Sequence, residues 1–297
     1  MDTHFYTQSE VTWERAFQAA YIFNDAFRDT FIREEYWPAQ FLTRGPVPAY
    51  GDRATAPAFW AVVRAQARAL YLQARSDPRF GLVLASESRM GSNDSRGSSE
   101  SSDLLIAEVP LAAATLGVPA YAPPFRPADG WVVWRTLRNW VLWLVFKLQD
   151  RLAFGSWTSP LVQPAMLAEF AYGSEHCGAN WTAARAAELA TAPRGRLQDE
   201  SYPKSLAYTL NQFAIASHSQ GRGLGRKFLV AVVEALREYA DVREPPNSGG
   251  PAKLELFSSP NAAEFYTRNG FHLAAKAPHR QPSGAVLVHH FFYMNLT

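Results

Sequence analysis

The chain has 297 residues, of which 47% are hydrophobic and 19% are charged, so it is long enough to bury a sizeable core in one elaborated domain. Its 29 Lys and Arg residues nearly balance 27 Asp and Glu residues, which argues against a nucleic-acid binder with a basic face. The single cysteine, Cys177, excludes an intrachain disulfide and a zinc site made of several thiolates. The first residues have neither the basic nor the apolar segment of a signal peptide, and we expect a soluble, cytoplasmic protein.

The first part of the chain predicts two helices and two strands. Apolar residues recur every three or four positions over 11–32, and a second helix begins near Pro57, a residue suited to a first helical turn. Short apolar runs at 80–85 and 104–111 predict strands. Between them, 86–103 is rich in Ser, Gly and charge, and we expect a flexible loop.

We expect a long insertion over 112–204, which begins with a Pro- and Ala-rich connection and continues with a helix at 131–153. That helix carries an apolar stripe at Trp134, Leu137, Val141, Leu144, Leu148 and Leu152. Its longest uncharged run, 139–146, is far shorter than the roughly 20 residues of a membrane span. We favour a helix that packs its stripe on the main domain or lines a pocket, and a membrane-surface helix is the alternative.

The last third of the chain predicts an alternating β-α-β-α-β unit. The expected elements are a strand at 205–216, a helix at 224–239, a strand at 253–257, a short helix at 261–268 and a strand at 286–295.

A glycine-rich turn joins the first strand and helix of this unit, with the sequence Gln-Gly-Arg-Gly-Leu-Gly from Gln220 to Gly225. Glycines allow successive N–H groups to point at one spot, and the following helix adds its positive N-terminal end, which favours a phosphate. The turn lacks the Gly-Lys-Ser/Thr ending of a Walker loop and has Arg226 where a dinucleotide fingerprint needs its third glycine. Taken alone, the motif is also compatible with a purely structural turn.

A second motif follows at the right distance, Asn-x-x-x-Phe-Tyr-x-x-x-Gly-Phe from Asn261 to Phe271. The two motifs in this order, each beside the expected strand and helix, resemble the GNAT superfamily of acetyl-CoA-dependent N-acetyltransferases over about 206–273. The resemblance implies an α/β (α+β) fold in which helices flank a mixed, mainly antiparallel sheet. We therefore expect 1–297 to form a single GNAT-like domain, with the helical insertion before the cofactor-binding strand.

The resemblance also implies how acetyl-CoA is held. The residues implied at the pyrophosphate are Gln220, Gly221, Arg222, Gly223, Leu224, Gly225 and Arg226. Main-chain groups of Phe213 and Ile215 would pair with the pantetheine arm, because the strand that carries them would splay from its neighbour. Asn261 would hydrogen-bond the same arm. Tyr266 would protonate the leaving thiolate, a role that suits a phenol; a core aromatic is the alternative for this residue. No metal is implied.

One departure from the family pattern affects the base. Many members carry a glutamate on the strand where this chain has Asn211, and an amide cannot accept the proton of the amine. His218, His289 and His290 are alternatives by pKa alone, and the amine could also reach the site neutral through water.

We therefore expect direct acetyl transfer, in a ternary complex, to a primary amine of a small or medium-sized metabolite. The aromatic-rich insertion suggests an enclosed pocket, as for a peptide-like or hydroxamate (siderophore-type) product of secondary metabolism. A protein acetyltransferase acting on lysine or an N-terminus is the first alternative. A non-catalytic acyl-CoA-binding protein is the second.

Overall fold

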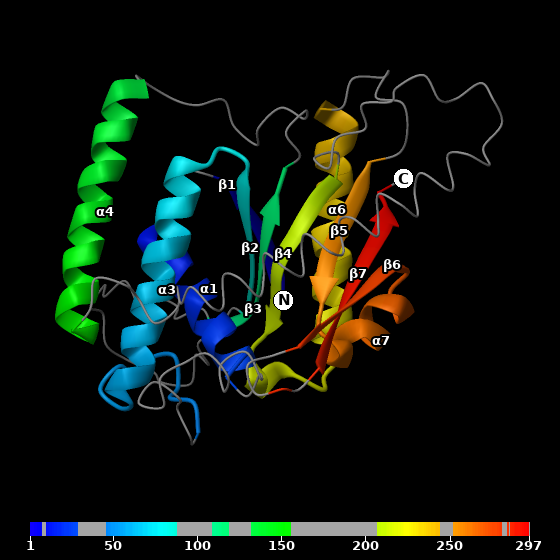
Figure 1. Ribbon diagram of the computed structural model, residues 1–297, viewed down its shortest axis with the longest axis horizontal. Helices are drawn as coiled ribbons and strands as arrows, with labels where there is room; N and C mark the ends of the chain where they lie inside the picture. The colour runs from blue at the N-terminus through cyan, green and yellow to red at the C-terminus, as the bar shows by residue number, and fades with distance from the viewer. Residues whose placement is uncertain are drawn as a thin grey trace, which may run out of the picture.

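The computed structural model describes residues 1–7, 10–28, 46–87, 109–118, 132–155, 207–243, 252–280, 284 and 286–296, and these build one seven-stranded sheet with helices on both faces (Figure 1). The strands are β1 (Asp2–Thr7), β2 (Phe80–Glu87), β3 (Val109–Gly117), β4 (Ala207–Ile215), β5 (Lys253–Ser258), β6 (His272–Arg280) and β7 (Val286–Asn295). Their order is β1-β2-β3-β4-β5-β7-β6, and every neighbouring pair is antiparallel except β4 and β5. The predicted fold class is confirmed.

Helices cover both faces because the strands alternate their side chains between two cores. On one face, α1 (Trp13–Ala26) and α3 (Pro57–Ser76) pack on Leu82, Leu84 and Ala113. On the other face, α6 (Leu224–Arg243) and α7 (Pro260–Arg268) pack on residues one position away, such as Val83 and Ala114. The central strands are therefore buried on both faces of the sheet. The ends of the strands are where a site can form.

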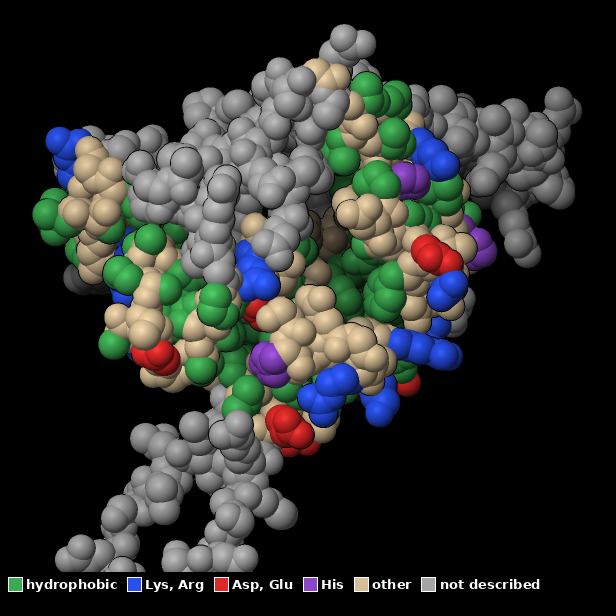
Figure 2. Space-filling model, turned by 90° about the horizontal axis from the view of Figure 1, so that it is seen from below, with side chains coloured by type: hydrophobic (Ala, Val, Ile, Leu, Met, Phe, Trp, Pro, Cys, Tyr) green, Lys and Arg blue, Asp and Glu red, His purple; other side chains and the backbone are tan. Residues whose placement is uncertain are grey.

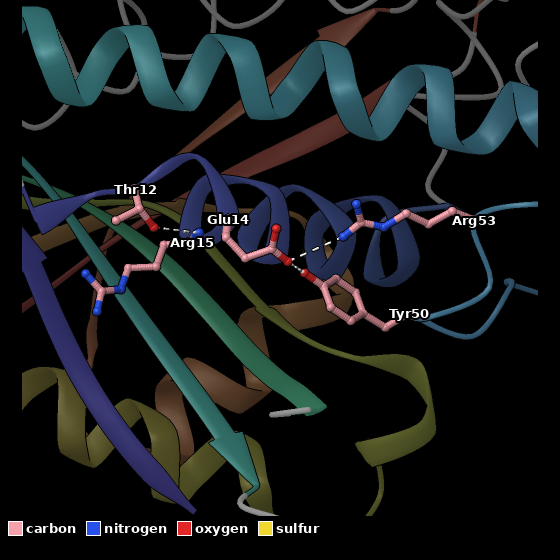
Figure 3. A network of polar contacts seen from close by, with 5 residues as sticks. All are labelled: Thr12, Glu14, Arg15, Tyr50 and Arg53. Atoms are coloured by element: carbon pink, nitrogen blue, oxygen red, sulfur yellow. Dashed lines mark hydrogen bonds and ion pairs between the residues drawn. The ribbon is translucent and has the colours of Figure 1, made fainter. Parts of the chain in front are cut away.

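The segment before α3 is held against the start of α1 by a polar network (Figure 3). Thr12 caps α1 by accepting a hydrogen bond from the N–H of Arg15. Glu14 accepts a hydrogen bond from the hydroxyl of Tyr50 and lies 3.4 Å from the guanidinium of Arg53. Burial and the hydrogen bond to Glu14 raise the pKa of Tyr50, so its hydroxyl stays protonated and keeps donating.

Helix α4 (Val132–Phe154) lies within one residue of its predicted bounds, but its packing differs from the prediction. It forms an outer layer on α3 (Figure 1), and the apolar positions Leu137, Val141, Leu144, Leu148 and Leu152 are exposed. The packed face instead holds Asp150, whose carboxylate pairs with Arg68 of α3. No helix among the described residues is both long and apolar enough to cross a membrane.

Two other expectations are corrected. The strand expected at 104–111 overlaps β3, which ends at Gly117, six residues later than expected, and so occupies the first residues of the segment 112–204 that we expected to be an insertion; 104–108 lie outside the described residues. Strands β1 and β6 were not predicted at all. The loop expected at 86–103 lies outside the described residues, apart from 86–87 at the end of β2, as does most of the insertion.

Candidate active site

The strands β4 and β5 separate part of the way along their length (Figure 1). They pair from Ala207 to Leu210 on β4 and from Lys253 to Leu256 on β5, and then diverge. Beyond this point β4 remains bound to β3, while β5 remains bound to β7. Among the described residues, no strand pairs with the β5 side of β4 from Asn211 onward. The predicted splay is therefore present.

A bulge on β4 coincides with the start of the splay. Thr115 of β3 is opposite Gln212 and Leu116 is opposite Leu210, so Asn211 has no partner position on β3. A bulge bends its strand and increases the local twist, which accounts for the divergence from β5. Asn211 itself is exposed, and a Cβ built on Gly117 would lie 3.5 Å from its amide nitrogen. Its amide thus lies over β3 at the point where the splay begins.

Phe213 and Ile215 lie on the separated part of β4, as the resemblance implies. The side chain of Phe213 packs against Phe228 of α6 and against Phe265 of α7, which places an aromatic surface between the two helices. The carbonyl of Ile215 accepts a hydrogen bond of 3.0 Å from the side chain of Gln220. Gln220 therefore fixes the turn to the strand end through its amide, a contact that the sequence motif did not reveal.

The glycine-rich turn has the backbone conformation that its glycines permit. Gly221 and Gly223 have φ values of 74° and 72°, in the left-handed region that other residues rarely adopt. No atom lies within 4 Å of a Cβ built on either glycine, so the space in front of the turn is open. Helix α6 begins directly after it at Leu224, with its first N–H groups free of intrahelical partners. The turn therefore offers an anion both donors and room.

Cations surround this turn. Arg222, Arg226 and Lys227 are all exposed, and Lys and Arg side chains gather along one rim of this end of the molecule (Figure 2). The same view shows a hollow lined by hydrophobic side chains. Cations beside an apolar hollow suit a ligand with a charged end and an apolar arm.

Gly225 differs from the other two glycines. It lies inside α6, and a Cβ built on it would approach Phe265 at 3.4 Å and Ile215 at 3.6 Å. A Cβ at these distances would make ordinary van der Waals contact. Gly225 therefore lies where α6 meets α7 and the end of β4, whereas Gly221 and Gly223 face open space.

A buried carboxylate anchors the turn from the opposite face of the sheet. Asp25, at the end of α1, is 2% exposed and accepts a hydrogen bond of 2.6 Å from the N–H of Ser217. Ser217 begins the short helix η3 (Ser217–Ser219), which leads into Gln220. The sequence analysis missed Asp25, because the two partners are 192 positions apart and neither lies in a motif.

Helix α7 supplies the two remaining predicted residues. Asn261 is exposed in the first turn, and no hydrogen bond of its side chain to another described residue is present. Tyr266 is 7% exposed and its ring packs among Phe213, Phe271 and Phe292. Burial raises the pKa of its phenol, so the hydroxyl keeps its proton at neutral pH. Contact with Phe213 brings Tyr266 next to the separated part of β4.

The three histidines fall in different places. His218 is exposed in η3, whereas His289 and His290 are both largely buried in β7. The ring of His290 stacks on Phe292, which in turn contacts Tyr266, and its backbone pairs with Ser258 at the end of β5. Burial lowers the pKa of His290, with Lys276 adding to the effect, so this imidazole is neutral and able to accept a proton near pH 7.

The structure thus brings most of the predicted residues to one end of the sheet: the separated part of β4, the glycine-rich turn and α7. Among the residues described, no group of three or more His, Cys, Asp and Glu side chains is placed to hold a metal ion. Cys177 lies outside the described residues.

Comparison with known proteins gives likenesses in structure only. No family model and no curated protein matches the sequence. An acetyltransferase structure from Corynebacterium glutamicum, named histone acetyltransferase HPA2 and related acetyltransferase, is 14% identical, with 98% of this chain and 96% of that chain covered and a TM-score of 0.41. Mosquito arylalkylamine N-acetyltransferase like 5b is 11% identical, with 99% and 100% covered and a TM-score of 0.39. Drosophila melanogaster polyamine N-acetyltransferase is 11% identical, with 99% and 100% covered and a TM-score of 0.34.

The structure itself carries the fold assignment. The mainly antiparallel sheet, the one parallel pair that splays, and the glycine-rich turn at the start of α6 all follow from the described residues. Together with the Asn261–Phe271 motif, which covers most of α7 and the turn after it, they agree with the fold that the resemblance to the GNAT superfamily implies.

Proposed function

We propose that the protein is a GNAT N-acetyltransferase that moves the acetyl group of acetyl-CoA to the primary amine of a small or medium-sized metabolite. This proposal is carried by the edge of β4 from Asn211 onward, which no described strand pairs and which leads through a short helix into the open glycine-rich turn. An extended arm with a pyrophosphate at its end fits that shape: main-chain groups of β4 pair with the arm, and the turn's N–H groups meet the phosphates. Acetyl-CoA has this form.

The cofactor contacts are assigned by position. The turn from Gln220 to Gly223 and the first N–H groups of α6 hold the pyrophosphate, with Arg222 and Arg226 adding charge at the rim. The main chain of Phe213 pairs with the pantetheine arm. For Ile215 we assign only its N–H to that arm, because Gln220 already donates to its carbonyl. Asn261 faces solvent at the start of α7, where its amide is available to the same arm.

The chemistry requires a proton to leave the amine and a proton to reach the sulfur. The new N–C bond forms as the C–S bond breaks, and acetyl-CoA supplies the activated acyl group. Tyr266 donates its phenolic proton to the leaving sulfur and is reprotonated from solvent. His290 is the best placed of the three histidines to take the amine proton, because it is neutral and shares Phe292 with Tyr266.

Holding both reactants in one site favours direct transfer. A ternary complex converts the encounter of amine and thioester into a step within one complex and removes much of its entropic cost. Free N–H groups of the β4 edge polarise the thioester carbonyl as negative charge develops on its oxygen.

The acceptor is proposed from the surroundings of the site. The hollow at this end is lined by hydrophobic side chains, which favours an amine with an apolar or aromatic body over a highly charged protein segment (Figure 2). Release of coenzyme A thiol in the presence of an amine panel that includes arylalkylamines, polyamines and hydroxamate precursors tests the proposal. Release that depends on the amine supports it, and binding of acetyl-CoA without release for any amine would favour the non-catalytic alternative.

A protein acceptor is the second candidate, and it predicts a different result. A lysine-containing or N-terminal peptide would then gain the mass of one acetyl group while free metabolite amines would not react. Intact-mass measurement on a peptide mixture, run beside the thiol assay, separates the two acceptor classes.

A further inference from the structure

Helix α4 is attached to the rest of the protein by its polar side. Asp150 pairs with Arg68 of α3 at a site where both side chains are about nine-tenths buried. The side-chain amide of Asn139 donates to the carbonyl of Arg75 at 3.4 Å, and Phe146 contacts Trp13 with 6.2 Å between ring centres. The contact with α3 therefore contains a buried ion pair where an amphipathic helix normally places its apolar stripe.

The opposite side of α4 carries the apolar residues. Eight large apolar side chains are between 43% and 79% exposed: Leu137, Trp140, Val141, Trp143, Leu144, Val145, Leu148 and Leu152. At 100° per residue, most of these positions fall on the half of the helix that faces away from Asn139, Phe146 and Asp150. Among the described elements α4 is the outermost on this side, so that half points outward (Figure 1). A contiguous apolar surface of this kind marks an interaction site. The exception is Trp143, and we call the other seven residues the outer face of α4.

The charges on α4 indicate what covers the outer face. The helix contains four cationic residues, Arg135, Arg138, Lys147 and Arg151, and one acidic residue. That acid is Asp150, which is already paired with Arg68. Trp140 lies on the outer face, and tryptophan favours the boundary between lipid headgroups and acyl chains. Apolar and indole side chains with a surplus of cations are the composition of helices that lie in the surface of an anionic membrane.

We propose that the outer face of α4 docks the protein on an anionic membrane surface. The helix lies in the plane of the interface, with its apolar side chains among the acyl chains and Arg138 at the level of the headgroups. Its buried ion pair with α3 keeps it attached to the folded protein during docking. This interaction does not depend on the acetyltransferase activity.

A second copy of the chain fits the same face less well. If two α4 helices met face to face in antiparallel orientation about Leu144 and Val145, Arg138 of one copy would lie opposite Arg151 of the other. In parallel orientation, each arginine would lie near the same arginine of the other chain. Either arrangement places like charges together across an apolar contact, whereas anionic headgroups neutralise them.

Co-sedimentation of the full-length protein with lipid vesicles tests the proposal. We expect binding to vesicles of phosphatidylcholine and phosphatidylglycerol in equal amounts, and much weaker binding to phosphatidylcholine alone, because the cations require anionic headgroups. Binding should weaken as salt is added, and tryptophan emission should shift to shorter wavelength as Trp140 enters the interface.

Leu144→Glu combined with Leu148→Glu provides the decisive variant. It should reduce the vesicle affinity about tenfold or more, because two carboxylates would have to enter the apolar layer. Val230→Glu is the matched control: Val230 is 46% exposed on α6, away from α4, and its replacement should leave vesicle binding unchanged. Unchanged melting temperatures would establish that both variants fold.

Two results would overturn the proposal. Absence of binding to the anionic vesicles at low salt would exclude a membrane surface as the occupant. A dimer that dissociates in the Leu144→Glu and Leu148→Glu variant, without any vesicle binding by the original protein, would assign the outer face to a second copy.

Discussion

At the scale of single residues, Tyr266 is the group whose role is most sharply testable. The structure gives its hydroxyl no hydrogen bond to another described side chain, while its ring packs among Phe213, Phe271 and Phe292. Tyr266→Phe should therefore keep the packing and the acetyl-CoA affinity, yet lower kcat by about 10²–10⁴, the share of a positioned acid.

Kinetics, calorimetric titration of acetyl-CoA and thermal unfolding on one preparation check this. Tyr71→Phe, the same change on α3, should alter none of the three. Turnover of Tyr266→Phe at the parental rate with a good acceptor would assign the proton to water or to another residue, and Tyr266 would then be a core aromatic.

A substitution at Gly223 tests whether the glycine-rich turn binds the pyrophosphate of acetyl-CoA. Its φ of 72° and the open space in front of it mean that Gly223→Asp adds both a strained backbone and a negative charge where a phosphate should bind. We expect acetyl-CoA affinity to fall about tenfold or more, equivalent to about 1.4 kcal/mol. Gly155→Asp is a matched control, because Gly155 also has a positive φ and open surroundings but follows α4. Equal affinity of Gly223→Asp and the parental protein would remove the turn from the site.

The role of His290 as the base can be tested by the pH dependence of activity. Burial lowers its pKa, and a base acts only when it is deprotonated, so kcat/KM should hold its plateau as pH falls and decline only below about 6.5, the ordinary pKa of histidine. His290→Gln should lose most of the activity near neutral pH and should abolish this limb in the activity that remains. His289→Gln, the neighbouring residue on the same strand, should retain the limb. If both variants keep the acidic limb of the pH profile, the amine reaches the site neutral through water.

The sequence indicated the residues of the site better than their contacts. Motif spacing placed Gln220, Gly223, Asn261 and Tyr266 correctly relative to the strands and helices that carry them. It could not show that Gly225 lies against α7 and the end of β4 while Gly221 and Gly223 face open space, because all three glycines look alike in a motif. Asp25 could not be found at all, since its contact with Ser217 exists only once the sheet and α1 are assembled.

At the scale of elements, α4 shows what periodicity can and cannot predict. The 3.6-residue pattern correctly predicted a helix and an apolar stripe, but it contains no information about which side meets the protein. If Leu137, Val141 and Leu144 were buried, changing each of them to serine would lower the free energy of unfolding by roughly 1.5–3 kcal/mol. Because all three are exposed, we now expect the triple variant to change the free energy of unfolding by no more than about 0.5 kcal/mol per site.

The face of α4 that packs on α3 should contribute more to the stability of the protein. Asp150→Ala leaves Arg68 buried without its partner and should cost about 3–5 kcal/mol. Replacing both, as Arg68→Met with Asp150→Leu, should recover much of that loss. Urea unfolding of the three variants checks this. A triple serine variant less stable than Asp150→Ala would mean that the stripe packs against the protein.

The strands that sequence reasoning missed share a physical cause. β1 and β6 are the two edges of the sheet, where one side of the strand meets solvent and the apolar signal is correspondingly weak. β6 even contains Pro278, a residue tolerated in edge strands because it cannot complete a ladder on both sides. The shifted bounds of β3 have another cause: its core is rich in alanine, which has a low strand propensity but fits between two helical layers.

At the scale of the whole molecule, the sheet consists of two antiparallel parts joined by the parallel pair β4 and β5. Their divergence leaves the later part of β4, at the centre of the sheet, without a partner strand on that edge among the described residues. Helices α6 and α7 then bring the glycine-rich turn and Tyr266 to that edge from the same side. A site of this kind holds two reactants beside each other, and we therefore expect direct transfer and no acyl-enzyme.

Initial rates of coenzyme A release, with acetyl-CoA and a reactive amine varied together, test that claim most directly. A ternary complex predicts double-reciprocal lines that intersect, and one acetylated amine formed for each coenzyme A released. Parallel lines would contradict direct transfer and indicate an acetylated enzyme, with Cys177 as the first residue to examine by mass spectrometry.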